Sequence, residues 1–243
     1  MSKTVTPYKD SKETKKQQVT TMFDTIAGNY DHLNRVISFG IDVSWRKKVI
    51  ALITEKSPEN ALDIATGTGD LAISLVETGA KKVVGLDISK GMLEIGRQKV
   101  ADLGLDQQIE MIVGDSENLP FDDNTFDAIT VAFGVRNFEN LELGLSEILR
   151  VLKPSGTFVV LETSVPEKFP FKQGYHFYTK MILPLIGKLF SKDKVAYKYL
   201  SDSAAKFPHG KAFNNILEKI GFIEVVNKPQ TFGVASIYIA SKN

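Results

Sequence analysis

The stretch Ala61-Leu62-Asp63-Ile64-Ala65-Thr66-Gly67-Thr68-Gly69-Asp70-Leu71-Ala72, "ALDIATGTGDLA", joins an apolar segment to a helix-like run through a glycine-rich turn. On either side of it, strand-like and helix-like segments alternate. This alternation predicts a mostly parallel, doubly wound sheet with helices on both faces, whose ligands lie at the carboxyl ends of the strands. Two further strand-like segments near the C-terminus predict a closing antiparallel hairpin, for a total of seven strands. The expected strands are 60–65, 81–89, 109–115, 126–134, 157–164, 222–228 and 234–241, and the expected core helices are 70–79, 90–104, 140–156 and 211–222.

The composition is that of a globular protein with one α/β domain. The 243 residues are 43% hydrophobic and 24% charged, with a net charge of +1, so no overall field favours nucleic acid. The absence of cysteine excludes disulfides, thiol nucleophiles and thiolate metal sites, and fits a reducing cytoplasm. The polar N-terminus predicts no signal peptide, and no stretch has the ~18 apolar residues of a membrane span.

We expect five parts within this single domain. Helical periodicity at 17–30 and 43–54 predicts an N-terminal helical cover, and the interruption of the strand–helix rhythm predicts a lid insertion. The parts are a mobile tail (1–16), the cover (17–54), the ligand-binding core (55–164), the lid (165–209) and a closing helix with its hairpin (210–243).

The glycine turn alone allows two ligands. Gly67, Gly69 and Ala72 satisfy the dinucleotide pattern G-x-G-x-x-A, and Asp87 follows at the distance of a ribose-binding acid, so a nicotinamide oxidoreductase is one alternative. Asp63, directly before the turn, favours a different ligand, because a carboxylate there repels a pyrophosphate and attracts an ammonium group. S-adenosylmethionine carries an ammonium and a sulfonium and no phosphate, and the glycines allow its close approach.

Acids follow three successive strands of the predicted sheet. Asp87 is placed to accept hydrogen bonds from both ribose hydroxyls, and Asp115 to accept one from the adenine amino group. The backbone of Ser116 is then a candidate partner for the adenine ring nitrogen. The alternative is that these acids only cap the helices that follow them.

Several longer stretches resemble one known family from about residue 20 to the C-terminus. They include "YDHLN" with "WR", "LDIATGTGDLA", "GLDISKGML", "GDSENLPFDDNTFD", "FGVRNF" and "YKYLSDSAAKFP", and one small departure is "KPSG", where the family commonly has two glycines. The resemblance is to the menaquinone/ubiquinone biosynthesis C-methyltransferases. It implies a Rossmann-like class I methyltransferase fold and transfer of a methyl group from S-adenosyl-L-methionine to a ring carbon of a polyprenylated quinol. The positions that it implies for the methyl donor are Thr66, Asp87, Asp115 and Ser116, to which we add Ile88 and Phe133 as neighbours.

Carbon methylation requires an electron-rich ring carbon. A quinol hydroxyl has a pKa of about 10, so only ~0.1% is ionised at neutral pH, and full ionisation is worth about 4 kcal/mol. Arg136 and Asn137 follow the fourth strand and are the candidates to act on that hydroxyl. Because arginine stays protonated, we expect Arg136 to stabilise the phenolate, with a water carrying the proton, and Asn137 to orient the oxygen. The alternative for Arg136 is an ion pair with an acid such as Glu139.

Two further candidates lie where an N-terminal helix folds over the donor. Tyr30 is placed to hydrogen-bond the substrate or to face the sulfonium, and His32 is a candidate base because of its ordinary pKa. A surface position is the alternative for His32. The reaction requires no metal.

The lid insertion combines an apolar helical stripe with many lysines. Three alternatives remain open for it: a lid packed on the sheet, a homodimer contact, or a surface that contacts the membrane and admits the isoprenoid tail. The stripe is Tyr175, Tyr178, Met181, Ile182, Leu185, Ile186 and Leu189, bent near Pro184, and the lysines are 168, 172, 180, 188, 192, 194 and 198.

The leading expectation is therefore methylation of demethylmenaquinol, in the cytoplasm or at the inner face of the cell membrane. The alternatives are a ubiquinone precursor or another lipid-like acceptor, a nicotinamide oxidoreductase, and a binding protein that retains only the donor pocket.

Overall fold

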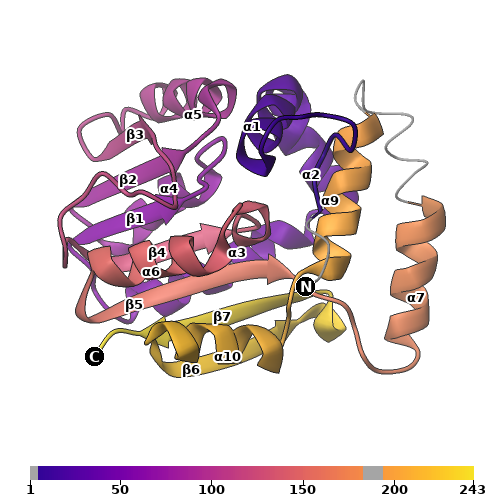
Figure 1. Cartoon of the computed structure of the whole chain (residues 1–243). Helices are drawn as coiled ribbons and strands as arrows, with labels where there is room; N and C mark the ends of the chain where they lie inside the picture. Colours follow the sequence, from indigo (N-terminus) through magenta and orange to yellow (C-terminus); the bar gives the residue numbers. More distant parts are fainter. Residues whose placement is uncertain (1–4, 183–193) are drawn as a thin grey trace.

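The computed structural model describes residues 5–182 and 194–243. Its seven strands form one sheet in the order β3-β2-β1-β4-β5-β7-β6, and Figure 1 shows this sheet through the middle of the molecule. The first five strands pair in parallel, whereas β7 is antiparallel to both β5 and β6. The predicted architecture, including the closing hairpin, is confirmed. The strands are β1 (Asn60–Ile64), β2 (Lys82–Asp87), β3 (Ile109–Val113), β4 (Phe126–Ala132), β5 (Leu152–Thr163), β6 (Ile223–Gln230) and β7 (Ala235–Ser241).

Both faces of the sheet are covered by helices. Successive strand residues point to opposite faces, so Leu62 packs into one hydrophobic cluster and Ala61 into the other. On the face toward the viewer in Figure 1 lie α6 (Leu141–Val151) and α10 (Lys211–Ile220). The other cluster is built with α3 (Ile41–Thr54), α4 (Asp70–Leu75) and α5 (Lys90–Asp102). Three short 3₁₀-helical turns lie between the larger elements: η2 (Val76–Thr78), η3 (Val135–Asn137) and η5 (Thr231–Gly233).

The helix expected at 140–156 ends earlier than predicted. It stops at Val151, and β5 already begins at Leu152, so that "LKPSG" belongs to the strand. A proline disfavours helical backbone in the residue before it, which here is Lys153. The left-handed backbone of Ser155 then turns the chain into the longer part of β5.

In the expected N-terminal cover (17–54), α3 accounts for the helix predicted at 43–54, and two helices lie where the periodicity predicted one at 17–30. They are α1 (Lys15–Ile26) and α2 (Tyr30–Ser38), separated by η1 (Ala27–Asn29). A capping box of Thr14 and Gln17 starts α1 two residues earlier than expected. Before it, Val5 and Tyr8 pack against the cluster that α1 forms with α5 and α9, so the described part of the expected mobile tail contacts the body.

The lid insertion contains α7 (Phe171–Phe177), η4 (Tyr178–Ile182) and α9 (Lys194–Lys206). Figure 1 shows α7 at the side of the molecule, with α9 between it and the N-terminal helices. Tyr178 ties this region to α2, because its hydroxyl donates to the carbonyl of Ile37 at 2.6 Å. Within the described ranges, we find no helix with the length and apolarity to cross a bilayer. Part of the expected stripe and lysine margin lies outside the described residues: Pro184, Leu185, Ile186, Lys188, Leu189 and Lys192.

Candidate active site

Two cavities meet at the carboxyl edge of the sheet, and they share the side chains of Tyr30 and Phe133. We call the first the glycine-turn cavity, because it opens above the turn after β1. The second, which we call the arginine cavity, lies between α2, α3, η3 and the lid. Of the residues that the sequence singled out, eight line the glycine-turn cavity: Tyr30, Gly67, Asp87, Ile88, Asp115, Ser116, Phe133 and Asn137.

The backbone is strained where the two cavities meet. Ala65 and Phe133 follow the neighbouring strands β1 and β4, and both have left-handed φ values, of 53° and 57°. Both residues line the glycine-turn cavity. Gly134 lets these two strand ends approach, since a Cβ at this position would lie 2.6 Å from the Cβ of Ala65. Such strain in non-glycine residues concentrates at functional sites.

Asp87 holds the glycine turn in shape. Its Oδ2 accepts the amide of Gly67 and its Oδ1 accepts the amide of Ser89, each at 2.8 Å. Burial raises the pKa of this carboxyl group, and the backbone hydrogen bonds oppose the rise. Each carboxylate oxygen keeps a second lone pair, so Asp87 can still accept ribose hydroxyls. Gly69 does not line the cavity; glycine is required there by the backbone, whose φ of 80° is left-handed.

Asp63 faces away from both cavities. It is fully buried, lines neither cavity, and its two oxygens accept the hydroxyls of Thr66 and Thr130 at 2.6 Å each. Burial raises the pKa of Asp63 to about 6. The sequence predicts that this carboxylate meets an ammonium group and that Thr66 meets the donor. The geometry instead turns both side chains toward each other, beneath the glycine turn.

Helix α1, part of the N-terminal cover that the sequence led us to expect, lines the glycine-turn cavity, but the sequence did not reveal the lysine contacts that hold it there. Lys16 donates to Oδ2 of Asp115 at 2.6 Å and lies 3.3 Å from a carboxylate oxygen of Glu117. The ammonium group of Lys15 donates to the carbonyls of Arg136 and Phe138 at 3.0 and 2.6 Å. Burial lowers the pKa of Lys15 to about 8. These contacts place α1 across the cavity that Asp115 and Ser116 line.

Arg136 lines the arginine cavity and forms a buried ion pair. The expected alternative partner was Glu139, but the partner is Glu162 at the end of β5, whose Oε1 accepts from Nη1 of Arg136 at 2.8 Å. The same nitrogen donates to the carbonyl of Phe133 at 2.5 Å. Among the described residues, neither Nε of Arg136 nor Oε2 of Glu162 has a hydrogen-bond partner.

Asn137 and His32 do not reach the arginine cavity. Asn137 lies on the wall of the glycine-turn cavity, where its Oδ1 accepts the hydroxyl of Tyr199 from α9 at 3.1 Å. His32 is exposed on α2 and lines neither cavity, since the next residue, Leu33, takes the inward position. The Nδ2 of Asn137 donates to the carbonyl of Phe133 at 3.3 Å, so Asn137 touches the wall between the two cavities and not the interior of the second, and we do not retain His32 as the base.

Tyr30 sits at the junction of the two cavities. Burial raises its pKa, whereas the positive charges of Arg136 and Arg46 act to lower it. A hydrogen bond with the side chain of Asn34 also acts to lower this pKa, and the neutral hydroxyl retains its capacity to donate to a ligand.

The arginine cavity is mostly apolar, with a few polar groups that converge on it. This pattern is typical of small-molecule sites. Several of its residues lie in or near the stretches that carry the family resemblance, but no role could be assigned to them from the sequence, because α2, α3, η3 and the lid bring them together only in space. They are Asn34, Ser38, Asp42, Trp45, Arg46 and Thr163.

The topology argues against the dinucleotide alternative. The dinucleotide-binding sheet has the order 3-2-1-4-5-6 with parallel strands, whereas here an antiparallel β7 lies between β5 and β6. The helix after the glycine turn, α4, has only 6 residues and carries Asp70 in its first turn, which would repel a pyrophosphate.

Comparison with known proteins agrees with this geometry. The model of the ubiE/COQ5 methyltransferase family matches residues 10–242. A relative from Bacteroides fragilis named demethylmenaquinone methyltransferase is 46% identical over 239 residues, which cover 98% of this chain and 97% of the relative. A Geobacter sulfurreducens protein named ubiquinone/menaquinone biosynthesis C-methyltransferase UbiE is 44% identical over 230 residues, covering 94% of this chain and 90% of that protein.

Solved structures of low sequence identity share the fold. A SAM-dependent methyltransferase from Thermotoga maritima has a TM-score of 0.64 at 21% identity, covering 92% of this chain and 99% of that one. Another, from Aquifex aeolicus, has a TM-score of 0.56 at 20% identity, covering 80% and 88% of the two chains. The match over almost the whole chain and the high identity to the curated relatives lead to one conclusion: this chain belongs to the ubiE/COQ5 methyltransferase family.

Proposed function

We propose that this protein transfers a methyl group from S-adenosyl-L-methionine to a ring carbon of demethylmenaquinol. The observation that carries the proposal is the meeting of the two cavities at Tyr30 and Phe133. One cavity has the polar groups that an adenosyl donor requires, and the other is an apolar slot with an arginine. The names of full-length relatives at 43–46% identity support the same reaction.

The residues of the glycine-turn cavity fit the methyl donor. Asp87 accepts the ribose hydroxyls with the lone pairs that the glycine turn leaves free, and Asp115 and Ser116 lie where the adenine is recognised. Phe133 and Tyr30 form the wall toward the second cavity. The donor, once bound, supplies an electrophilic methyl group on a sulfonium.

The arginine cavity supplies the other half of the chemistry. Arg136 stabilises the phenolate form of the quinol, which is worth about 4 kcal/mol at neutral pH. Its Nη1 is held by Glu162 and Phe133, which fixes the guanidinium at the cavity wall, so that its other N–H groups are the candidate donors to the acceptor oxygen. When the quinol ring is enclosed in this cavity, its reactive carbon is aligned with the methyl group of the donor in the neighbouring cavity. Such alignment lowers the activation barrier by several kcal/mol more.

The test is methyl transfer from labelled S-adenosylmethionine to a panel of demethylated naphthoquinols and benzoquinols. We expect transfer to demethylmenaquinol, and binding of S-adenosylhomocysteine but not NAD by calorimetry. Transfer only to a benzoquinol would favour the ubiquinone precursor, which would be consistent with the name of the Geobacter relative. Binding of S-adenosylhomocysteine without transfer to any acceptor would leave only a binding protein, and binding of NAD would refute the proposal.

We also propose that the protein works at the inner face of the cell membrane, where a polyprenylated quinol resides. Aromatic side chains gather beside the arginine cavity: Phe39, Phe169, Phe177 and Phe232 are 60–79% exposed. We call these four residues the aromatic rim. Exposed apolar surface is characteristic of interaction sites, and aromatic side chains are typical of surfaces that lie on lipid.

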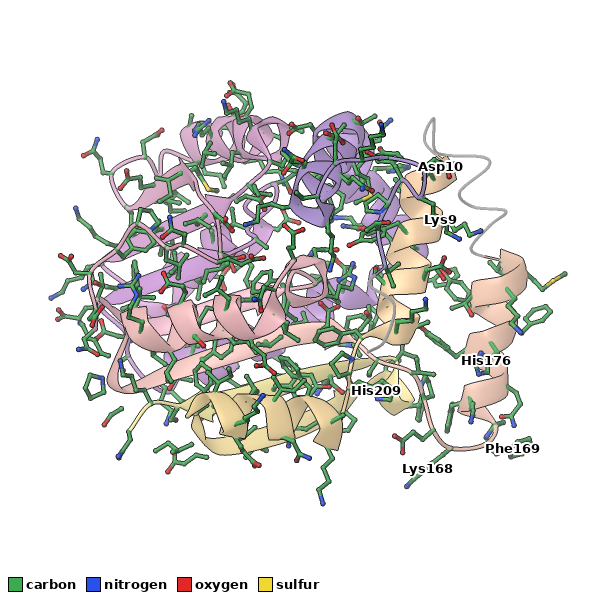
Figure 2. The ribbon with its side chains drawn as sticks, in the orientation of Figure 1. Lys9, Asp10, Lys168, Phe169, His176 and His209 are labelled. Carbon is green, nitrogen blue, oxygen red and sulfur yellow. The ribbon has the colours of Figure 1, made fainter. Side chains whose placement is uncertain are left out.

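Contacts connect the rim to the cavity. Phe232 stacks on Phe171 with ring centroids 4.0 Å apart, and Phe39 lies 6.0 Å from Tyr178, which lines the arginine cavity. Figure 2 shows Lys168 beside Phe169 at the lower end of α7, at the edge of the molecule. Lysines next to exposed aromatic residues favour an anionic lipid surface.

Vesicle co-sedimentation tests this location. We expect wild-type protein to pellet with anionic vesicles, and the variant F39S/F177S/F232S to remain in solution. Leu103→Ser is the matched control, since Leu103 is 59% exposed at the end of α5, far from the rim. Equal pelleting of wild type and the triple variant would refute lipid contact. Dimers in light scattering that the triple variant abolishes would instead assign the rim to a second copy of the chain.

A further inference from the structure

The arginine cavity contains a second arginine–carboxylate pair that the mechanism above does not use. Asp42 and Arg46, one turn apart on α3, form an ion pair, and both line the cavity. Asp42 is almost completely buried and also accepts the hydroxyl of Ser38 at 2.5 Å. A buried ion pair is costly to desolvate, so its presence in an apolar slot requires an explanation.

The position of Arg46 relates it to the reacting centre. Its guanidinium carbon lies 6.0 Å from the centroid of the Phe133 ring, and Phe133 belongs to both cavities. Tyr30, the other shared residue, is under the electrostatic influence of both Arg46 and Arg136. The two arginines therefore lie on the cavity that would hold the acceptor ring, each with its own carboxylate: Asp42 for Arg46, and Glu162 for Arg136.

A quinol ring has an oxygen at each of two opposite positions. In the proposed mechanism, Arg136 stabilises the negative charge on the oxygen next to the carbon that receives the methyl group. In a cavity with apolar walls, the opposite oxygen would be buried without a partner unless a second polar group were present, and such burial is unfavourable. Arginine held by a carboxylate is a rigid donor for an oxygen with partial negative charge.

We propose that Arg46, held in place by Asp42, binds the second oxygen of the acceptor, so that the enzyme selects 1,4-dihydroxy aromatic rings over monohydric phenols. This inference rests on the proposed function and assigns its substrate specificity to a residue of α3. Asp42 is a positioning residue, because it acts through Arg46, whereas Ser38 orients Asp42 from α2.

A purely structural role for Arg46 makes a different prediction. Its guanidinium also lies 4.0 Å from Asp70, which pairs with Lys99 at 2.7 Å, and Lys99 in turn pairs with Asp31 at 2.6 Å. This chain of charges links α2 and α3 to α4 and α5. If Arg46 served only to stabilise this link between helices, then removal of another ion pair in the same chain of charges would have the same effect on catalysis.

Lys99 provides the matched control. It belongs to the same chain of charges but does not line the arginine cavity. We compare wild type, Arg46→Gln, Asp42→Asn and Lys99→Met. The acceptors are a short-chain demethylmenaquinol and its analogue in which the hydroxyl remote from the methylated carbon is replaced by hydrogen. For each variant we measure kcat/KM on both acceptors, and S-adenosylhomocysteine affinity by calorimetry.

We divide kcat/KM for the dihydroxy acceptor by kcat/KM for the monohydroxy analogue. We expect this ratio to fall about tenfold or more in Arg46→Gln, because only the dihydroxy acceptor loses a contact. Asp42→Asn, which keeps the shape of the side chain, lowers the ratio in the same direction and serves if Arg46→Gln does not fold. Lys99→Met leaves the ratio as in wild type, and donor affinity stays within about threefold in all variants.

Two outcomes overturn the inference. An unchanged ratio in both Arg46→Gln and Asp42→Asn removes Arg46 from acceptor recognition. A ratio that falls equally in Lys99→Met assigns the effect to the structural link. Failure of the proposed function is distinguishable, because wild type would then methylate neither acceptor.

Discussion

The buried pair of Arg136 and Glu162 allows structural and catalytic roles to be separated in one experiment. Nη1 of Arg136 lies 2.8 Å from Oε1 of Glu162, and both side chains are almost completely buried. Removal of one partner leaves an uncompensated buried charge, which costs about 3–5 kcal/mol. In a chain of this length the melting temperature of either Arg136→Met or Glu162→Gln should therefore fall by roughly 6–20 °C.

The double variant R136M/E162Q removes both charges. The amide side chain introduced by Glu162→Gln would retain an oxygen for the backbone N–H of Thr163, from which Glu162 accepts at 2.7 Å. We expect the double variant to regain at least half of the lost stability, because coupled sites are not additive. Its activity should not return, since the phenolate loses its positive partner.

The assay combines thermal unfolding with methyl transfer at saturating donor. Turnover should fall about 100- to 1,000-fold in Arg136→Met and in the double variant. Glu162→Gln should lose about tenfold to 100-fold, because Arg136 is then less well aligned. Lys153→Met is the control: its pair with Asp127 is partly exposed at 2.7 Å, so it should cost less than about 1 kcal/mol and leave turnover unchanged.

Two results would refute this reasoning. If the double variant is as unstable as the sum of the single variants, the two charges do not compensate each other. If Arg136→Met retains more than a tenth of wild-type turnover, Arg136 does not stabilise the phenolate. Loss of S-adenosylhomocysteine binding in Arg136→Met would place its role in the glycine-turn cavity instead.

Three further predictions follow from the glycine turn and its support. Because burial raises the folded-state pKa of Asp63 to about 6, the folded protein binds a proton more tightly than the unfolded chain. The free energy of unfolding should then decrease by up to about 3 kcal/mol as the pH rises from about 4 to 6. Urea unfolding at pH values of about 4.5 and 7 should show about 2 kcal/mol of this decrease in wild type and not in Asp63→Asn, and an equal pH dependence in the two proteins would contradict it. Asp87→Ala should weaken S-adenosylhomocysteine binding about tenfold or more, as the turn and the ribose both lose an acceptor, and calorimetry showing unchanged affinity would exclude that role. Gly134→Ala should lower stability by about 1–3 kcal/mol, because the new Cβ would lie 2.6 Å from that of Ala65, and an unchanged melting temperature would show that the strand ends adjust freely.

The sheet and the glycine-turn cavity were accessible from the sequence for a simple reason. The alternation of strand-like and helix-like segments predicts parallel strands, and the residues that follow parallel strands meet at one edge of the sheet. The placement of Gly67, Asp87, Asp115 and Ser116 around one cavity follows from this rule without knowledge of side-chain packing. The family resemblance added the reaction, which is methyl transfer to a ring carbon of a quinol, and the position of Arg136 after the fourth strand made it the candidate to stabilise the phenolate.

Side-chain partners were decided only by the tertiary structure. Arg136 pairs with Glu162 rather than Glu139, and Asp63 faces Thr66 and Thr130 rather than a ligand. No periodic rule relates such positions, because each pairing depends on how buried surfaces of different elements fit together.

The acceptor side shows the same limit most clearly. The sequence predicted that an N-terminal helix and a lid would cover the site, yet it assigned no role to Asp42 or to Arg46, which belongs to the motif "WR". Strand ends converge because the backbone hydrogen bonds of the sheet require it. Helices of the cover have no such register, so only the packing of their apolar faces determined which polar side chains meet the substrate.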